Sequence, residues 1–202
     1  MMKTLAIGLL VTLFLSGCAI TRSPGFYSGY KRLTPAQHAQ IQFVPTNQPV
    51  PPQNGQLIYA VAARSLLQSM PNGTDTTLVY LWGPRCHSQE CASLQSVQAI
   101  CNQRNYRLYV VAEYYDIEQI NLQPRLSNPI LAINCRFYQT EYCDKYVQLF
   151  SGELRQGIQL ADHARYGRYY LFKGNRFVKA LNALVGASPQ FPSFQPARLP
   201  SK

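Results

Sequence analysis

The cysteine at position 86 stands where an apolar run meets a turn. Residues 78–81 are apolar throughout and are followed by a Trp-Gly-Pro sequence, which predicts a buried central strand that ends at a tight turn. We expect a helix to begin at Cys86. A thiol in the first turn of a helix lies near unpaired backbone N–H groups and the positive end of the helix dipole, and both favour the thiolate. The flanking Arg85 and His87 are expected to lower the pKa of this thiol further.

The segment Trp82–Cys86, followed by a helical pattern, resembles the Trp-x-x-x-Cys entry of periplasmic thioredoxin-like proteins of the TlpA/redoxin type. The resemblance gives Cys86 the role of the nucleophile. Gln89 stands where the family has its second cysteine, and Cys91 follows two residues later, so Cys86 and Cys91 are the candidate catalytic residues. Five residues of a regular helix turn through about 500°, which would point these two thiols about 140° apart. A disulfide between them therefore needs an irregular first turn.

The elements that position Cys86 follow a strand, helix, strand order. We predict a helix over about residues 86–104 with a buried stripe of Leu94, Val97, Ile100 and Cys101. Cys101 is therefore predicted to be a core thiol without a redox role. Leu108–Ala112 predicts a second buried strand, and the βαβ order makes it parallel to the first. Residues 57–70 are rich in Ala and Leu and predict an amphipathic helix before this unit.

The second half of the chain predicts a further strand at residues 129–133, a helix at about 140–155 and a hairpin at 169–181. Cys135 lies before the helix and Cys143 lies inside it. This pair is predicted either as a second disulfide or as two separate thiols.

The hairpin resembles the one that closes a thioredoxin sheet. The resemblance implies an α/β protein with a thioredoxin-like three-layer fold, in which a mixed central sheet is flanked by helices, over residues 55–181. In that family a cis-proline stands before the first hairpin strand and packs against the active-site cysteines. Here Gly167-Arg168 occupies the position.

The N-terminus has the pattern of a bacterial lipoprotein signal. Residues 1–17 combine Lys3 with an apolar core and end in Leu-Ser-Gly before Cys18, and the core is too short for a permanent membrane span. Cleavage before Cys18 would leave that residue with several acyl chains, which hold a protein stably on a membrane. The alternative is an ordinary cleaved export signal. Ala19 is not the aspartate associated with inner-membrane retention, so we expect an outer-membrane location that faces the periplasm.

Segments rich in proline flank the predicted domain. Residues 18–54 are predicted to be a lipidated tether with at most one edge strand, at 41–44, and residues 182–202 a disordered basic tail. The net charge is +10, and the basic end is predicted to be a solvated surface that can meet anionic lipid or an acidic partner. No nucleic-acid motif is present, and the three histidines are scattered, so neither nucleic acid, nor a metal, nor a cofactor is expected.

Two functions fit this pattern. The missing cysteine at Gln89 and the missing proline near Gly167 favour an envelope binding or structural module, anchored through Cys18, that has lost the standard dithiol motif and contacts an envelope protein partner. The alternative is a thiol-disulfide oxidoreductase or thiol peroxidase in which Cys86 attacks and Cys91 or a partner thiol resolves. Acylation of Cys18 leaves an odd number of cysteines in an oxidising compartment, so at least one thiol stays unpaired.

Overall fold

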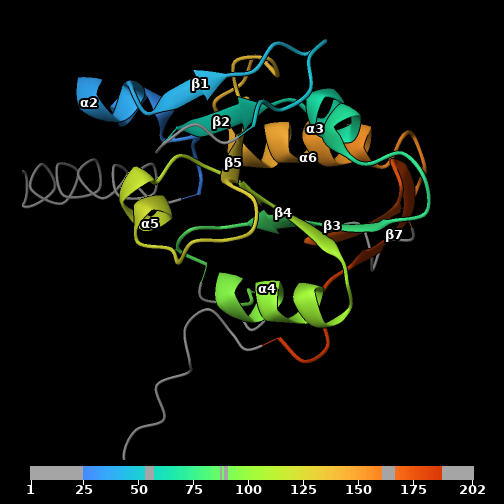
Figure 1. Cartoon of the computed structure of the whole chain (residues 1–202). Coiled ribbons are helices and arrows are strands. Elements are labelled where there is room, and N and C mark those ends of the chain that lie inside the picture. Colours follow the sequence, from blue (N-terminus) through green and yellow to red (C-terminus); the bar gives the residue numbers. More distant parts are fainter. Residues whose placement is uncertain (1–24, 53–56, 87, 89–90, 161–166, 188–202) are drawn as a thin grey trace, which may run out of the picture.

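A seven-stranded mixed sheet forms the centre of the protein (Figure 1). The computed structural model describes residues 25–52, 57–86, 88, 91–160 and 167–187. The strands are β1 (Ile41–Phe43), β2 (Ile58–Val61), β3 (Thr76–Trp82), β4 (Arg107–Ala112), β5 (Ile130–Ile133), β6 (Tyr169–Lys173) and β7 (Arg176–Leu181), in the spatial order β1-β2-β5-β4-β3-β6-β7. The first five strands pair in parallel, and β6 and β7 pair antiparallel. The described part of the chain is therefore mixed α/β.

The strand before Cys86 lies inside this sheet. On one side β3 pairs in parallel with β4, placing Val79 opposite Tyr109, and on the other it pairs antiparallel with β6, placing Val79 opposite Tyr170. All residues of β3 after Thr76 are buried, as its unbroken apolar run predicts for a strand covered on both faces. The predicted parallel pair and the neighbouring hairpin are confirmed.

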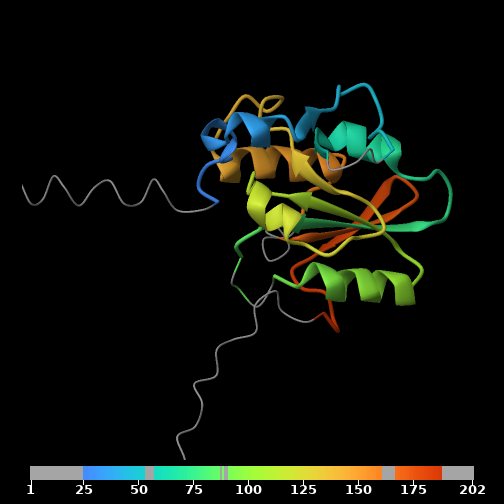
Figure 2. The same ribbon diagram turned by 60° about the vertical axis from the view of Figure 1, so that its left-hand side comes forward.

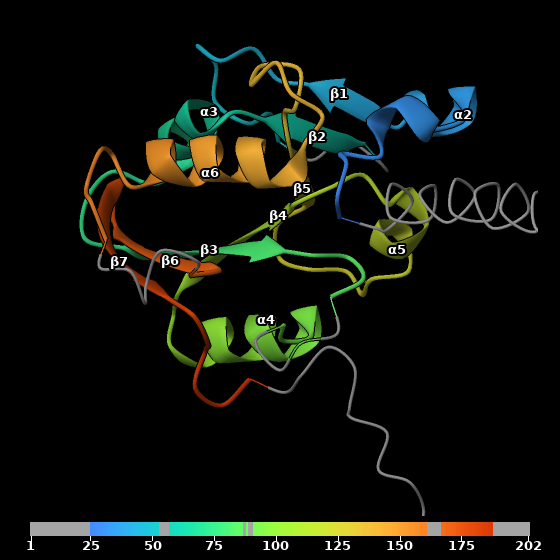
Figure 3. The same ribbon diagram turned by 180° about the vertical axis from the view of Figure 1, so that it is seen from behind.

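Helices cover both faces of the sheet (Figures 1 and 3). The helix α4 (Leu94–Gln103) lies on one face, and α3 (Ala63–Ser69) and α6 (Cys143–Leu154) lie together on the other. The short α5 (Ile117–Asn121) follows β4, and Figure 2 shows the two covering layers from a second direction. Within the described ranges, the longest apolar helix falls short of what is needed to cross a membrane.

Two predicted helices begin later than the sequence suggests. The first half of the helix expected at residues 57–70 is strand β2, because Ile58, Tyr59 and Val61 are β-branched or aromatic and are buried between neighbouring strands. The helix expected from Cys86 begins only at Leu94. Its start is fixed by Ser93, whose Oγ accepts a hydrogen bond from the Ser96 amide at 3.3 Å.

The described N-terminal segment folds onto the domain. It contains the 3₁₀ turn η3 (Tyr30–Arg32), the short helix α2 (Pro35–His38) and the expected edge strand β1. We call the edge of the sheet at which the parallel strands end the carboxyl edge. Residues 25–29 cross this edge, and we call them the strap. Ser28 binds both sides of the crossing: its amide donates to the Glu141 carbonyl at 2.8 Å, and its carbonyl accepts from the Tyr115 amide at 2.7 Å.

The two ends of the chain are described only in part. Residues 1–24, which hold the expected signal segment and Cys18, and residues 188–202 of the expected tail lie outside the described residues. The beginning of the expected tail is described, and Leu184 there is 7% exposed and packs against the core.

Candidate functional site

A disulfide joins Cys86 to Cys91 in the loop between β3 and α4. The two Cα atoms are 6.0 Å apart, and the described residues of the loop are not helical, which is the irregular backbone that such a bond needs. Cys91 is fully buried, whereas Cys86 is partly exposed. A reagent from solvent therefore reaches the disulfide through the Cys86 sulfur.

Two tyrosines from the sheet hold the loop at its Cys91 end. The Tyr80 hydroxyl donates to the carbonyl of Ala92 at 3.1 Å, and the amide of Ala92 donates to the Tyr169 hydroxyl at 3.3 Å. The two rings stack with centroids 4.5 Å apart. Ala92 is next to Cys91 in the chain, so adjacent strands β3 and β6 fix the backbone beside the buried sulfur.

The Cys86 end of the loop is held by the chain that follows β4. The Arg85 amide donates to the Tyr114 hydroxyl at 2.7 Å, and its guanidinium Nε lies 2.5 Å from Oδ2 of Asp116. The Asp116 carboxylate therefore offsets part of the Arg85 charge. Cys86 lies well before the first turn of α4. One expected cause of a low Cys86 pKa, the helix start, is therefore wrong. The effect of Arg85 stays a prediction, and His87 lies outside the described residues.

The Ser88 hydroxyl lies beside the disulfide, at the same distance from both sulfurs. Its Oγ is 3.4 Å from the sulfur of Cys86 and 3.4 Å from that of Cys91. An O–H group in this place can donate to whichever sulfur becomes a thiolate when the disulfide opens.

An ion pair lies beside the disulfide. Glu113 Oε1 and Arg168 Nη1 are 2.8 Å apart, and their side chains are 17% and 23% exposed. A methyl group added at Gly83 would lie 3.1 Å from Glu113 Oε2, 3.2 Å from Cys86 Cβ and 3.6 Å from Arg168 Nη1. The ion pair and Cys86 thus converge on Gly83, and a methyl group there would crowd Glu113 and Cys86.

Burial raises the pKa of the Glu113 carboxyl, and the charge of Arg168 offsets part of that rise. The ion pair lines a pocket of about 340 Å³ on the α6 side of the sheet, together with Cys143, Asp144, Ser151, Tyr170 and neighbouring residues. The carboxyl group therefore has access both to a small cavity and to the neighbourhood of Cys86, which suits a group that takes up and releases a proton.

The three remaining described thiols, Cys101, Cys135 and Cys143, are free and buried. Burial raises the pKa of Cys101 and of Cys143 to about 12 and also raises that of Cys135. Cys101 packs in the core, as predicted. Cys135 and Cys143 stand as two separate thiols, which is one of the two predicted alternatives, and the Cys143 sulfur lies 2.9 Å from the Tyr146 hydroxyl.

Sequence reasoning found both cysteines but missed the residues around them. It placed Glu113 in a loop and Arg168 only where the family has its proline. One signal was present: Glu113 follows β4 directly, just as Gly83 follows β3, and groups at the ends of adjacent parallel strands meet at one edge of the sheet. Nothing in the sequence pattern marked Tyr80 and Tyr169 as supports of the loop.

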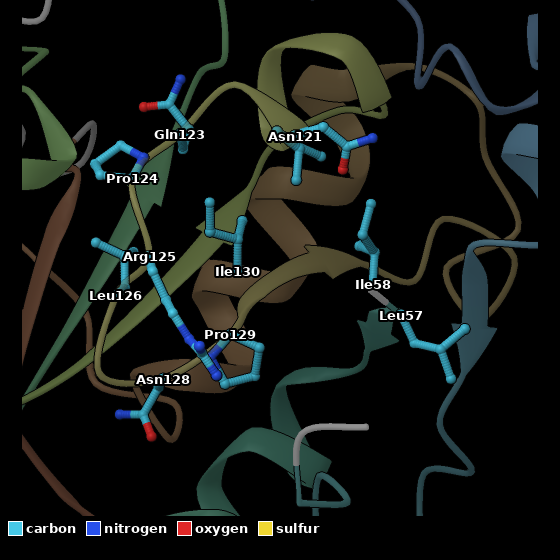
Figure 4. Close-up of a pocket in the computed structure, with 11 residues that line it drawn as sticks. Leu57, Ile58, Asn121, Gln123, Pro124, Arg125, Leu126, Asn128, Pro129 and Ile130 are labelled. Atoms are coloured by element: carbon cyan, nitrogen blue, oxygen red, sulfur yellow. The ribbon is translucent and has the colours of Figure 1, made fainter. Parts of the chain in front are cut away.

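A second cavity of about 560 Å³ lies at the opposite edge of the sheet, where β2 and β5 begin (Figure 4). Its walls carry the apolar side chains of Leu57, Ile58 and Ile130, with Arg125 as the charged group. No cysteine lines it, and among the described residues no cluster of His, Cys, Asp and Glu could hold a metal ion. This cavity is therefore separate from the disulfide, which lies at the carboxyl edge.

Comparisons of the chain with protein-family models, with curated proteins and with solved structures found no match.

Proposed function

We propose that this chain is an exported, lipid-anchored thiol-disulfide oxidoreductase of the thioredoxin-like type. The observation that carries the proposal is the unequal exposure of a disulfide at the end of a central strand: Cys86 is partly exposed and Cys91 is fully buried. Exchange requires one sulfur that a partner can reach and a second that is held close enough to close the bond again.

The arrangement around β3 supports the thioredoxin-like assignment. A strand ends at Trp-Gly-Pro, a helix and a parallel strand follow, and an antiparallel hairpin lies on the other side. Two features depart from the family pattern. The second cysteine is Cys91, whereas the family has it at the position of Gln89, and Arg168 stands where the family has its proline. These departures change the spacing of the two sulfurs without removing the second one.

The exchange follows from which sulfur is accessible. A thiolate of the substrate attacks the sulfur of Cys86, the bond to Cys91 breaks, and Cys91 leaves as a thiolate that the Ser88 hydroxyl stabilises. A second substrate thiolate then attacks its own sulfur in the mixed disulfide and releases Cys86. Two electrons pass from the substrate dithiol to the protein, and the substrate becomes a disulfide. The reverse sequence reduces a substrate disulfide.

Glu113 is the proton-exchanging group in this proposal. Burial raises the pKa of this carboxyl, which makes the carboxylate a stronger base for proton exchange with a nearby thiol. Arg168 moderates this rise and holds the side chain toward Gly83 and Cys86.

A binding module without thiol chemistry, which the sequence alone favours, does not need an exposed sulfur. The paired substitutions Cys91→Ser and Cys86→Ser separate the two functions. The Cys91→Ser protein keeps the accessible Cys86 thiol, which should attack a disulfide substrate, release one of its two sulfurs as a thiolate and remain joined to the other as a stable mixed disulfide. Cys86→Ser should trap none, and Cys101→Ser is the control and should behave as the unchanged protein. Equal trapping by the two variants, or none by either, contradicts the oxidoreductase.

The anchor rests on the Leu-Ser-Gly-Cys sequence that ends at Cys18. Cys18→Ala should block processing or release the protein from the membrane fraction, measured by fractionation and by the mass of the N-terminal peptide. A variant that is processed normally and stays on the membrane would contradict the anchor and leave the disulfide chemistry untouched.

A further inference from the structure

Exposed aromatic side chains gather where the strap meets α6. Phe26 and Tyr142 are 44% and 46% exposed. Their ring centroids are 5.9 Å apart, and the Tyr27 ring lies 4.9 Å from that of Phe26 and 5.2 Å from that of Tyr142. We call these three residues the aromatic patch. Exposed apolar residues that occur singly need no explanation, but a contiguous group of rings indicates a contact surface.

Cationic side chains surround the aromatic patch. The Lys145 ammonium lies 5.8 Å from the centre of the Tyr142 ring, and the Arg32 guanidinium lies 5.9 Å from that of Tyr27. Lys31 is 77% exposed and lies 3.9 Å from Glu141. Because Glu141 and the exposed Asp144 offset two of these three charges, the surface is only weakly cationic. Phenylalanine and tyrosine rings with lysine and arginine at their rim are typical of residues at a membrane–water interface.

The strap also sets the distance from this patch to the expected anchor. Gly25 lies seven residues after Cys18, and a fully extended chain of seven residues spans at most about 25 Å. Acyl chains on Cys18 would therefore keep the strap within reach of the lipid headgroups. The occupant that chain continuity favours is the bilayer that holds those chains.

The strap lies next to the disulfide loop as well. A methyl group added at Gly25 would lie 3.3 Å from the Tyr114 ring, and the Tyr114 hydroxyl accepts the amide hydrogen of Arg85 beside Cys86. Tyr114 thus lies between the start of the strap and the loop that holds Cys86. Whatever surface the strap faces, the carboxyl edge with Cys86 lies close to it.

We propose that the aromatic patch rests in the headgroup layer of the membrane to which Cys18 is anchored, so that the Cys86–Cys91 disulfide works next to that membrane. This inference rests on the anchor in the proposed function. It makes the substrates thiol proteins that are themselves held in or close to the same bilayer. Because the surface is weakly cationic, the rings contribute more to the contact than charge does.

Amine labelling of the lipidated full chain tests the orientation. The protein is added to preformed phosphatidylcholine vesicles, with and without a fifth of phosphatidylglycerol, and treated with a water-soluble acylating reagent, and each lysine is followed by peptide mass. Lys31 and Lys145 should react several-fold more slowly on vesicles than in free protein, with little effect of the anionic lipid. Lys173 and Lys179, which are exposed on the hairpin of β6 and β7, should react at the same rate in both.

Matched substitutions complete the test. Phe26→Ser with Tyr142→Ser should restore the reaction of Lys31 and Lys145 on vesicles, whereas Val178→Ser, which removes another exposed apolar side chain far from the strap, should not. A protein that floats with the vesicles while Lys31 and Lys145 react as in solution overturns the orientation alone. A protein that fails to float overturns the anchor and the orientation together, and mixed-disulfide trapping then still decides the redox function.

Discussion

The Cys86–Cys91 pair and the Cys135 and Cys143 thiols follow two parallel strands of one mixed sheet, β3 and β5, yet they differ in exposure and in the groups around them. Cys86 is partly exposed, and polar groups surround its loop. Cys135 and Cys143 are 1% and 4% exposed, and burial raises the pKa of both. Position at the end of a strand therefore does not make a cysteine reactive. Exposure of one sulfur and a nearby partner for the thiolate decide it.

Removal of the disulfide should have the largest effect on stability. A crosslink across a loop this short contributes about 2 kcal/mol by restricting the unfolded chain, so Cys86→Ser with Cys91→Ser should lower the free energy of unfolding by about that amount. Cys135→Ser with Cys143→Ser removes no crosslink, so the change in unfolding free energy that it causes should be the same with and without reductant. Urea unfolding with and without dithiothreitol measures both changes. If the unfolding free energy of the unchanged protein is the same with and without reductant, the crosslink is contradicted.

Loss of the Tyr80 hydroxyl should weaken both the fold and the loop. Tyr80→Phe removes the hydrogen bond to the Ala92 carbonyl and should cost about 1 kcal/mol. Tyr109→Phe is the matched control, because it removes a comparable bond to the Ser69 carbonyl at 3.0 Å far from the disulfide. Both variants should lose stability, but only Tyr80→Phe should change the rate of exchange with glutathione. Identical exchange rates would show that Tyr80 does not position Cys91.

Burial of the Glu113 carboxyl should make stability depend on pH. In the folded protein the Glu113 pKa lies above its unfolded value of about 4.3, so the native state binds more protons in that window and stability falls as the pH rises through it. Arg168→Gln removes the charge that lowers this pKa, so the loss of stability should continue to higher pH. Each further unit of rise in the Glu113 pKa should add about 1.4 kcal/mol to the total loss. Urea unfolding from pH 4 to pH 8 measures it.

The double variant Arg168→Gln with Glu113→Gln is the control for that experiment. It lacks the titrating carboxyl, so the added dependence on pH should disappear. A dependence that persists in the double variant would assign it to another group.

The smallest effect is expected for Arg85. Its side chain is 45% exposed and paired with Asp116, and exposed ion pairs contribute at most about 1 kcal/mol. Arg85→Gln should therefore change stability by less than that, and should barely change the alkylation rate of reduced Cys86, because its charge is already engaged. A large drop in that rate would support the sequence-based prediction that Arg85 activates the thiol.

The sequence predicted the parallel β3–β4 pair, the hairpin and the buried Cys101 because unbroken apolar runs and helical spacing are local signals. It failed at residues 57–61, where burial between two strands overrides the helix preference of Ala and Leu. It also placed the start of α4 at Cys86, since neither a disulfide nor a serine cap seven residues away appears in hydrophobic periodicity. Glu113 and Arg168 meet only through the order of the strands, which a single sequence does not specify.

Stepwise reduction followed by alkylation tests the central claim most directly. The folded protein is equilibrated in glutathione buffers of decreasing potential, alkylated for short times at several pH values, and mapped by peptide mass. We predict that Cys86 labels first and fastest once the disulfide opens, and that Cys101, Cys135 and Cys143 label only after unfolding. A disulfide that stays closed until the protein unfolds, or a buried thiol that labels as fast as Cys86, would contradict the account.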